Sequence, residues 1–171
     1  MVGDAEDTAQ RELRAYISVG SHGIKPFTNY NLSRSTETII RIGVRNVGQV
    51  PARNVRWFFG VEISENGRRK DFPIKDEFYG ENLVIQPGTE MVRSQRMKFT
   101  KGDIQHVVTD EWHLYVWGKI CYTDGFDNPR FTLFCHRYDR DGIGVGDINV
   151  TTVPFITGES MRYHQYGNDA D

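Results

Sequence analysis

Large apolar residues recur at every second position in two neighbouring stretches of the chain, residues 38–45 and 55–63. This period of two is typical of strands that bury one face. Gly48 and Pro51 lie between the stretches, and these residue types favour a turn or a bulge. The pattern therefore predicts two strands that face each other as a hairpin, with Gly48 at a positive φ and Trp57 in the core.

Other apolar stretches bounded by turn residues predict further strands. Trp112–Thr123 and Arg130–Tyr138 are separated by the turn-rich segment Asp124–Pro129, so they predict a second hairpin. The remaining predicted strands are Leu13–Val19, Leu83–Ile85 and an island at Ile148–Ile156.

Two segments carry features of a sheet edge or its cover. Met91–Thr100 is a predicted strand on which we expect Arg93, Arg96 and Lys98 to be exposed. Charged side chains on an outer face protect an edge strand against unwanted pairing. Lys70–Gly80 mixes charged residues, a proline and aromatic residues, and predicts an irregular cover or edge excursion.

The strand pattern determines the predicted fold class. It gives about seven to eight strands with no strong amphipathic helix between them, which favours antiparallel pairing. We therefore predict an all-β protein, an immunoglobulin-like antiparallel β-sandwich. A jelly roll or small barrel is the alternative, because alternation does not determine topology. Asp4–Arg14 is rich in helix formers and acidic at its start, so it predicts a short N-terminal helix.

The length of 171 residues and a hydrophobic content of 38% suit one domain with a real core. We expect an N-terminal helical lead-in over residues 1–12 and the sandwich over residues 13–138. Residues 139–171 are predicted to be a C-terminal extension that is partly disordered at its end.

A predicted loop, Gly20–Arg34, is the candidate binding surface, since long loops are often functional. It displays Phe27 and Tyr30 among polar residues. The alternative interpretation is that these two aromatic side chains pack onto the sandwich.

Charge gives little indication of a partner. The chain has 21 Lys and Arg against 23 Asp and Glu, a net charge of −2, which does not favour nucleic acid. A run of about 18 apolar residues, as a membrane span needs, is not seen in the sequence. Basic residues around the first predicted hairpin form either a positive face or a solvated sheet face: Arg41, Arg45, Arg53, Arg56, Arg68, Arg69 and Lys70.

The segment Asn46–Val55, N-V-G-Q-V-P-A-R-N-V, resembles the N-x-G-x-x-P-A-x-N-V turn of immunoglobulin-like domains in bacterial envelope proteins. With Arg14–Tyr16 and Gly118–Cys135, the chain is similar to a family of uncharacterised proteobacterial proteins that carry an N-terminal membrane anchor before one such domain. The chain departs from that family in having Asp127, where glycine is usual, and in showing no anchor.

This resemblance implies a cell-envelope location and, in the full-length protein, a membrane anchor, with the side of the membrane left open. The family supplies no known catalytic residues.

Candidate metal sites in the sequence are weak. Asp139–Gly142 resembles the start of a calcium loop but lacks a glutamate at the twelfth position. His106, His113 and His136 have no zinc-ligand spacing, so a zinc site would have to be assembled by tertiary contacts. We predict no metal ligand and no cofactor.

Catalytic motifs are equally weak. Asp124 and Asp127 lie in a predicted turn, where aspartate is favoured for backbone hydrogen bonding. The alternative, a glycosidase pair, would need a cleft. The sequence contains no G-x-S-x-G motif and no glycine-rich phosphate loop. We predict no catalytic residue.

The two cysteines lie on the two arms of the second predicted hairpin. Cys121 and Cys135 are equidistant from a turn centred near Asn128, so they could face each other as a disulfide. A one-residue bulge would send them to opposite faces, and a buried free cysteine is common. The disulfide therefore stays a hypothesis beside the free thiols.

Taken together, these features favour a non-enzymatic envelope module that binds a protein partner, or less readily a glycan, through loops or an exposed strand edge. A hydrolase or metal-dependent enzyme on a β-sandwich is one alternative. A structural spacer is the other. The oligomeric state is left open.

Overall fold

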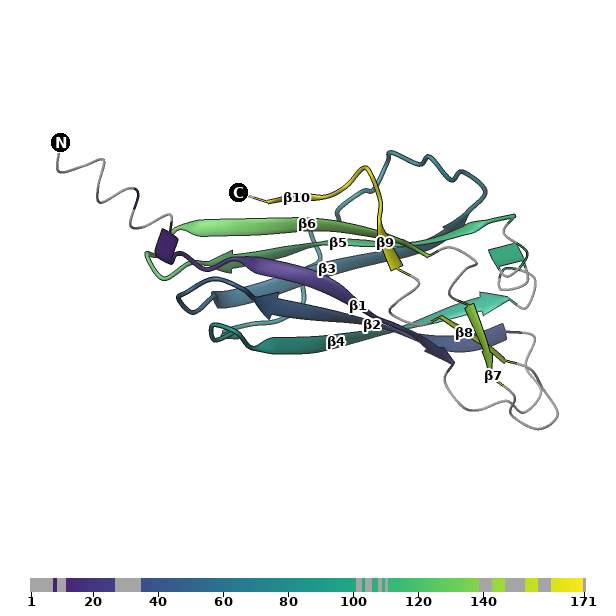
Figure 1. Ribbon diagram of the computed structural model, residues 1–171, viewed down its shortest axis with the longest axis horizontal. Coiled ribbons are helices and arrows are strands. Elements are labelled where there is room, and N and C mark those ends of the chain that lie inside the picture. Colours follow the sequence, from purple (N-terminus) through teal and green to yellow (C-terminus); the bar gives the residue numbers. More distant parts are fainter. Residues whose placement is uncertain are drawn as a thin grey trace.

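Two antiparallel β-sheets pack face to face as a sandwich in the computed structural model (Figure 1). The predicted all-β class is therefore confirmed. The first sheet has the strand order β4-β2-β1-β8-β7, and the second has the order β10-β6-β5-β3, with β9 also paired to β6. The structure describes residues 8, 12–26, 35–100, 103, 106, 107, 109, 111–138, 143–146, 153–156 and 161–170. The strands are β1 (Ile17–Pro26), β2 (Ser35–Asn46), β3 (Arg53–Ser64), β4 (Glu90–Thr100), β5 (His113–Thr123), β6 (Pro129–Tyr138), β7 (Ile143–Gly146), β8 (Val153–Ile156), β9 (Met161–Tyr163) and β10 (Asp169–Ala170).

β1 extends to Pro26, so part of the loop predicted for Gly20–Arg34 is strand. The pairing of β1 with β2 shifts its register between Ser21 and Ile24, and Gly23 lies there with a φ of 81°. Glycine adopts this conformation at little steric cost, so the strand continues through the bulge.

The hairpin predicted between residues 38–45 and 55–63 is wrong. β2 pairs with β1 and β4 in the first sheet, whereas β3 pairs with β5 in the second. The chain therefore crosses from one sheet to the other through residues 47–52. Alternation correctly located both strands but carried no information about which partner each one pairs with.

Asn46, which is fully buried, fixes this crossover. Its Oδ1 accepts hydrogen bonds from the N–H groups of Gly48 (3.0 Å) and Tyr16 (3.4 Å). Its Nδ2 donates to the carbonyls of Val50 (2.8 Å) and Ile85 (3.0 Å). The turn residues that predicted a hairpin thus build an arch between the sheets.

Gly48 does not have the predicted positive φ. A Cβ at this position would lie 2.3 Å from the carbonyl oxygen of Arg14 and 2.5 Å from the amide nitrogen of Tyr16. Those distances are far below van der Waals contact. Glycine is therefore required here because another backbone segment approaches closely, and not because of an unusual φ.

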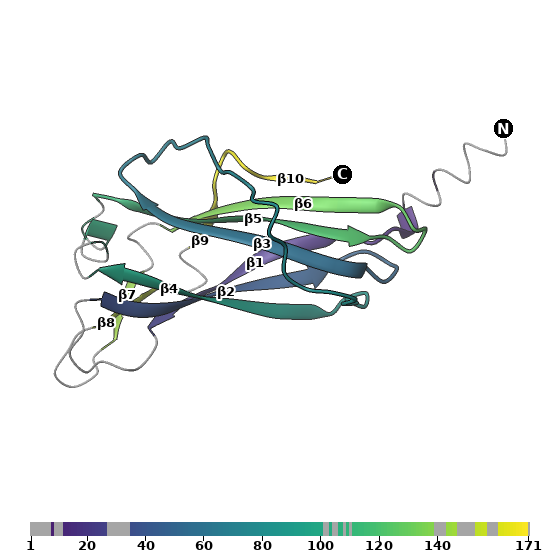
Figure 2. The same cartoon turned by 180° about the vertical axis from the view of Figure 1, so that it is seen from behind.

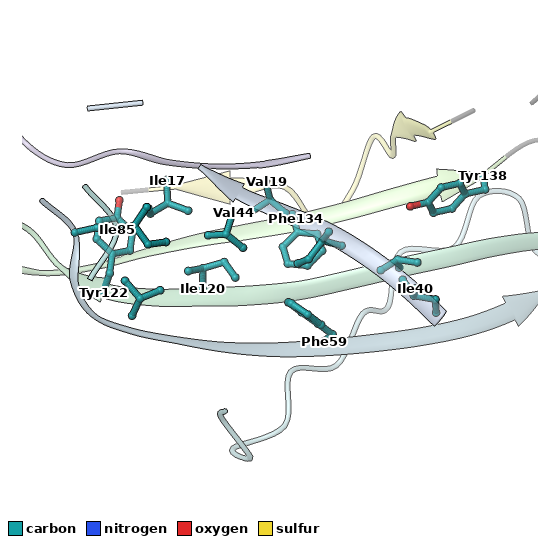
Figure 3. Close-up of a cluster of buried hydrophobic side chains, with 14 of the residues drawn as sticks. Ile17, Val19, Ile40, Val44, Phe59, Ile85, Ile120, Tyr122, Phe134 and Tyr138 are labelled. Carbon is teal, nitrogen blue, oxygen red and sulfur yellow. The ribbon is translucent and has the colours of Figure 1, made fainter. Parts of the chain in front are cut away.

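The main core lies between the sheets and is built from every second residue of the facing strands (Figure 3). Phe59 and Phe134 meet edge to face with their ring centroids 5.8 Å apart. The pattern of alternate burial matches the prediction for the facing strands. Figure 3 labels Ile17, Val19, Ile40, Val44, Phe59, Ile85, Ile120, Tyr122, Phe134 and Tyr138.

Part of the outer face of the second sheet is also buried, beneath residues 65–78, which we call the cover segment. This stretch leaves the end of β3 and arches over the sheet before the chain reaches β4 (Figure 2). The irregular cover predicted for Lys70–Gly80 is therefore confirmed. The buried residues of this second cluster are Phe58, Tyr115, Trp117 and Cys135, packed against Phe72, Ile74 and Phe78.

β5 and β6 form the predicted second hairpin. Residues 161–170, within the extension that was expected to be partly disordered, pair with β6 as β9 and β10. Asn168 supports this pairing, because its Oδ1 accepts the N–H of Cys135 at 2.9 Å. Strands of three and two residues are too short to show a period of their own, so the sequence pattern missed them.

The short helix predicted for Asp4–Arg14 falls largely outside the described residues and stays a prediction. Where the chain is described, no helix has both the length and the apolar character needed to cross a membrane.

Candidate functional site

Two of the predicted sites lie outside the described residues. These are the binding surface at Phe27 and Tyr30 and the calcium-like segment at Asp139–Gly142. Both stay predictions.

Of the two alternatives left open for the cysteines, the disulfide is contradicted, because Cys121 and Cys135 are both free. The β5–β6 register pairs Cys121 with Phe131 and Cys135 with Trp117. The cysteines are thus four positions out of register along neighbouring strands, a separation of about 13 Å. Bridged cysteines have Cα atoms within about 7 Å of each other.

Asp124, rather than Asn128, organises the turn and thereby sets this register. Its Oδ1 accepts the N–H groups of Phe126 (2.9 Å) and Asn128 (3.0 Å), and its Oδ2 accepts from Arg130 Nε at 3.0 Å. Burial alone would raise the pKa of Asp124, but these hydrogen bonds hold that pKa below its ordinary value. Asp127 adopts a φ of 61° in the same turn. The Asp124 carboxylate is thus a turn former as predicted, and Asp127 lies in the turn through its backbone conformation.

The three histidines considered as zinc ligands have separate environments. His106 contacts Glu111 at 2.6 Å, whereas His113 packs against Tyr115. His136 is fully buried, and burial lowers its pKa to about 4. In the described part of the chain, no three His, Cys, Asp or Glu side chains are placed to hold a metal ion.

The cluster beneath the cover segment is rich in groups that could do chemistry, but its polar side chains bond to backbone carbonyls and its thiol is buried. Burial raises the pKa of the Cys135 thiol to about 12, which makes it a poor nucleophile at neutral pH. Four side chains of this region form hydrogen bonds to backbone carbonyls of the cover segment and fasten that segment to the sheet. These bonds are Tyr115 Oη to the Asn66 carbonyl (2.8 Å), Trp117 Nε1 to the Pro73 carbonyl (3.0 Å), Arg137 to the Gly67 carbonyl (2.9 Å) and His164 Nε2 to the Arg69 carbonyl (2.7 Å).

One long side of the sandwich is closed by a row of hydroxyl contacts, which we call the hydroxyl ladder. Alternate carbonyls along the start of β1, from Ala15 just before the strand to Val19, accept hydroxyls from the second sheet. The next rung joins two hydroxyls, those of Ser21 and Tyr138. The donors to carbonyls are Tyr122 to Ala15 (3.4 Å), Thr132 to Ile17 (3.1 Å) and Tyr163 to Val19 (3.0 Å).

The opposite side, which we call the open side, is bordered by β3 and β4, the end strands of their sheets (Figure 2). Only the first half of β3 is covered there. Trp57 exchanges backbone hydrogen bonds with Tyr79 (2.9 and 2.8 Å), and Val55 donates to the Leu83 carbonyl (3.1 Å). The odd-numbered residues of β3 therefore point their backbone groups away from β5.

The second half of β3 continues this phase, so the backbone groups of Phe59, Val61 and Ile63 also point away from β5. No backbone partner of their outward-facing groups is found among the residues that the structure describes. Their side chains point inward, where Val61 and Ile63 are only partly buried against the core. This uncovered edge of β3 therefore combines open backbone groups with an apolar flank.

Arg93 spans the open side from β4. It was predicted to be exposed on the outer face, but it shares the inward phase of Met91, and its guanidinium lies 4.5 Å from the ring centroid of Trp57. It donates to the Val92 carbonyl at 3.2 Å and contacts the Met91 sulfur. Trp57, predicted for the core, is only partly buried at this edge.

The predicted cluster of basic residues is divided between the two sheets. Arg41 and Arg45 occupy the outward phase of β2 in the first sheet, whereas Arg56 belongs to β3 in the second. Arg69 lies in the cover segment and pairs with Glu62 at 2.6 Å. These residues therefore do not form one positive face.

Comparison with known proteins gives limited information. No protein-family model and no curated protein matches the chain. Among solved structures, a Bordetella pertussis protein provisionally named ApaA is 10% identical with a TM-score of 0.43, covering 71% of this chain and 92% of that one. An Archaeoglobus fulgidus protein is 15% identical with a TM-score of 0.37, covering 68% and 93%. Both scores are under 0.5, so the function is inferred from the residues of this chain.

Proposed function

We propose that this domain is a non-catalytic protein-binding module that pairs an extended segment of a partner with the uncovered edge of β3. The observation that carries the proposal is the open backbone edge at Phe59, Val61 and Ile63. Strand addition gains its affinity from main-chain hydrogen bonds and its selectivity from alternate side chains.

The contrast between the two sides of the sandwich supports this choice. The hydroxyl ladder occupies the free carbonyls of β1, and β9 and β10 occupy the edge of β6. Within the described part of the chain, the edge of β3 has no such protection after Trp57. Its flank is apolar, which suits alternate side chains of a peptide better than the hydroxyls of a glycan.

We infer further that the sandwich is of the immunoglobulin-like class. The order β4-β2-β1 packed against β3-β5-β6 corresponds to the E-B-A and C-F-G strands of that class. The crossovers from β2 to β3 and from β4 to β5 also fit it. An experimental structure in which β2 paired with β3 would contradict this assignment.

The resemblance of Asn46–Val55 to turns of envelope domains supports a place in the cell envelope for the proposed module, anchored in the full-length protein. Fractionation of cells that express the full-length gene product tests this location. Recovery of the protein with the membranes is expected, and recovery in the cytosol would contradict it.

Val61→Pro tests strand addition. The N–H of Val61 faces outward, so proline removes an edge donor while the hydrogen bonds from β3 to β5 remain, a placement that edge strands tolerate. Val61→Thr is the matched control, because it changes the side chain but keeps the N–H and the branched shape.

A phage-displayed library of random decapeptides is the probe, selected against the native domain. Peptides should be enriched that bind Val61→Thr but lose most of their binding to folded Val61→Pro. If the enriched peptides bind folded Val61→Pro as well as the native domain, the β3 edge is not the binding site. If no peptide is enriched, the spacer interpretation is favoured.

A further inference from the structure

We infer that Arg93 and Trp57 form a carboxylate-binding subsite on the open side, which selects partner segments with an acidic residue at the end that lies beside Phe59. This inference rests on the proposed function, because it specifies the chemistry of the segment that β3 would bind. Its basis is the set of contacts made by the Arg93 guanidinium.

Among the residues that the structure describes, Arg93 has no acidic partner. Its contacts within the described part of the chain are the Val92 carbonyl, the Met91 sulfur and the face of the Trp57 ring, and its Nε has no hydrogen-bond partner there. Arg69 and Arg130, in contrast, each pair with a carboxylate. A partly buried guanidinium with unused donors binds a carboxylate through charge-assisted hydrogen bonds.

The position of Trp57 determines where this carboxylate would lie. Trp57 is two residues before Phe59, a distance of about 7 Å along the strand. Tyr79 already pairs with Trp57, so an added strand must stop beside Phe59. The last inward-facing side chain of the added strand would then lie next to the guanidinium held on the Trp57 ring.

The electrostatic environment supports the same assignment. Burial lowers the pKa of Arg93, because desolvation disfavours its charged form. A bound carboxylate would offset that cost. Stacking on the indole ring also limits the rotamers of the long side chain, so less entropy would be lost when an acidic group binds.

A second role for Arg93 is compatible with its position. An inward-pointing charge on an end strand discourages edge-to-edge association with other copies. That role requires no ligand. The two roles differ in what a charge substitution does, since only the subsite predicts a change in the peptides that bind.

The test uses the same decapeptide library, selected separately on the native domain, Arg93→Gln and Arg93→Glu. We expect peptides from the native domain to share an acidic residue at one end. That preference should disappear on Arg93→Gln and become a preference for lysine or arginine on Arg93→Glu. Replacing the acidic residue of a selected peptide by its amide should weaken binding to the native domain by roughly tenfold.

The last measurement needs no protein variant, so it holds even if a substitution at Arg93 impairs folding. Peptides that bind the native domain but not Val61→Pro, and that share no acidic residue, would overturn the subsite and leave strand addition intact. The same conclusion would follow if Arg93→Gln only increased self-association in gel filtration and left the peptide preference unchanged. Failure to obtain any peptide sensitive to Val61→Pro would instead remove the proposed function itself.

Discussion

Replacing Asn46 by aspartate reverses one hydrogen-bonding group at the crossover between the sheets. The Nδ2 group, which donates to the carbonyls of Val50 at 2.8 Å and Ile85 at 3.0 Å, becomes an oxygen that faces both. Each buried carbonyl that loses its donor costs about 1–3 kcal/mol. The two bonds accepted by Oδ1 can remain. We therefore expect Asn46→Asp to lower the free energy of unfolding by about 2–6 kcal/mol at neutral pH.

The penalty should depend on pH. The facing carbonyls disfavour the charged form, so they raise the pKa of the new carboxyl in the folded protein above that of the unfolded chain. As the pH rises, the unfolded chain releases this proton first, so stability falls. At acid pH the protonated carboxyl can donate one of the lost bonds. The difference between variant and native protein should therefore be smaller at pH 4 than at pH 7.

Urea unfolding, followed by tryptophan fluorescence at both pH values, measures these differences. Asn54→Asp is the matched control, because Asn54 is exposed and its side chain's one hydrogen bond among the described residues is a 3.5 Å contact with Thr123. Its free energy of unfolding should stay within about 0.5 kcal/mol of the native value. An unchanged midpoint for Asn46→Asp at pH 7, or a penalty of the same size at both pH values, would refute the hydrogen-bond arrangement.

Three further predictions concern the glycine, thiol and histidine positions. Gly48→Ala should cost about 1–3 kcal/mol in thermal or urea unfolding, whereas Gly20→Ala, where a Cβ meets nothing within 4 Å, should cost far less; equal losses would contradict the close approach at the crossover. Alkylation of the native protein followed by mass spectrometry should label Cys121 readily and Cys135 only after unfolding, and a mass showing a bridge would contradict the hairpin register. Because the pKa of His136 falls to about 4 in the folded state, the unfolded chain takes up its proton first as the pH drops, so stability should fall by up to roughly 3 kcal/mol between pH 6.5 and 4. His136→Phe should flatten that part of the curve, and an unchanged slope would show that another group causes it.

The strands could be predicted from the sequence, whereas their partners could not. Period-two alternation located β2, β3, β5 and β6, because one face of each strand must be apolar to form the core. Alternation is the same whether the partner is the next strand or a distant one. The arch at Asn46 depends on carbonyls that lie 4 and 39 residues away, at Val50 and Ile85, and no local pattern indicates the second.

The register of the second hairpin was predicted wrongly for a related reason. Counting outward from Asn128 places the centre of the turn two residues too late, because the pairs from Thr123 with Pro129 to Leu114 with Tyr138 are all centred on Phe126. The Asp124 carboxylate sets this centre by accepting the N–H groups of Phe126 and Asn128. A shift of this kind moves each cysteine past its expected partner. Side-chain capping of a turn is local, but the sequence alone does not show which N–H groups the carboxylate accepts.

For the candidate site, the sequence held an indication that the prediction overlooked. Arg93 differs in phase from Arg96 and Lys98, so the three side chains cannot share one face of a strand. Grouping them by charge hid that difference. The uncovered edge of β3, in contrast, follows from where Tyr79 stops pairing, which is a tertiary feature.

The hydroxyl ladder distributes sequence constraint unevenly between the sheets. A carbonyl oxygen is the same in every amino acid, so β1 can change its side chains and still accept these bonds, provided that its inward positions stay apolar. The donors have no such freedom, because only a hydroxyl of the right length reaches across. We therefore expect Tyr122, Thr132 and Tyr163 to change less during evolution than the side chains of β1.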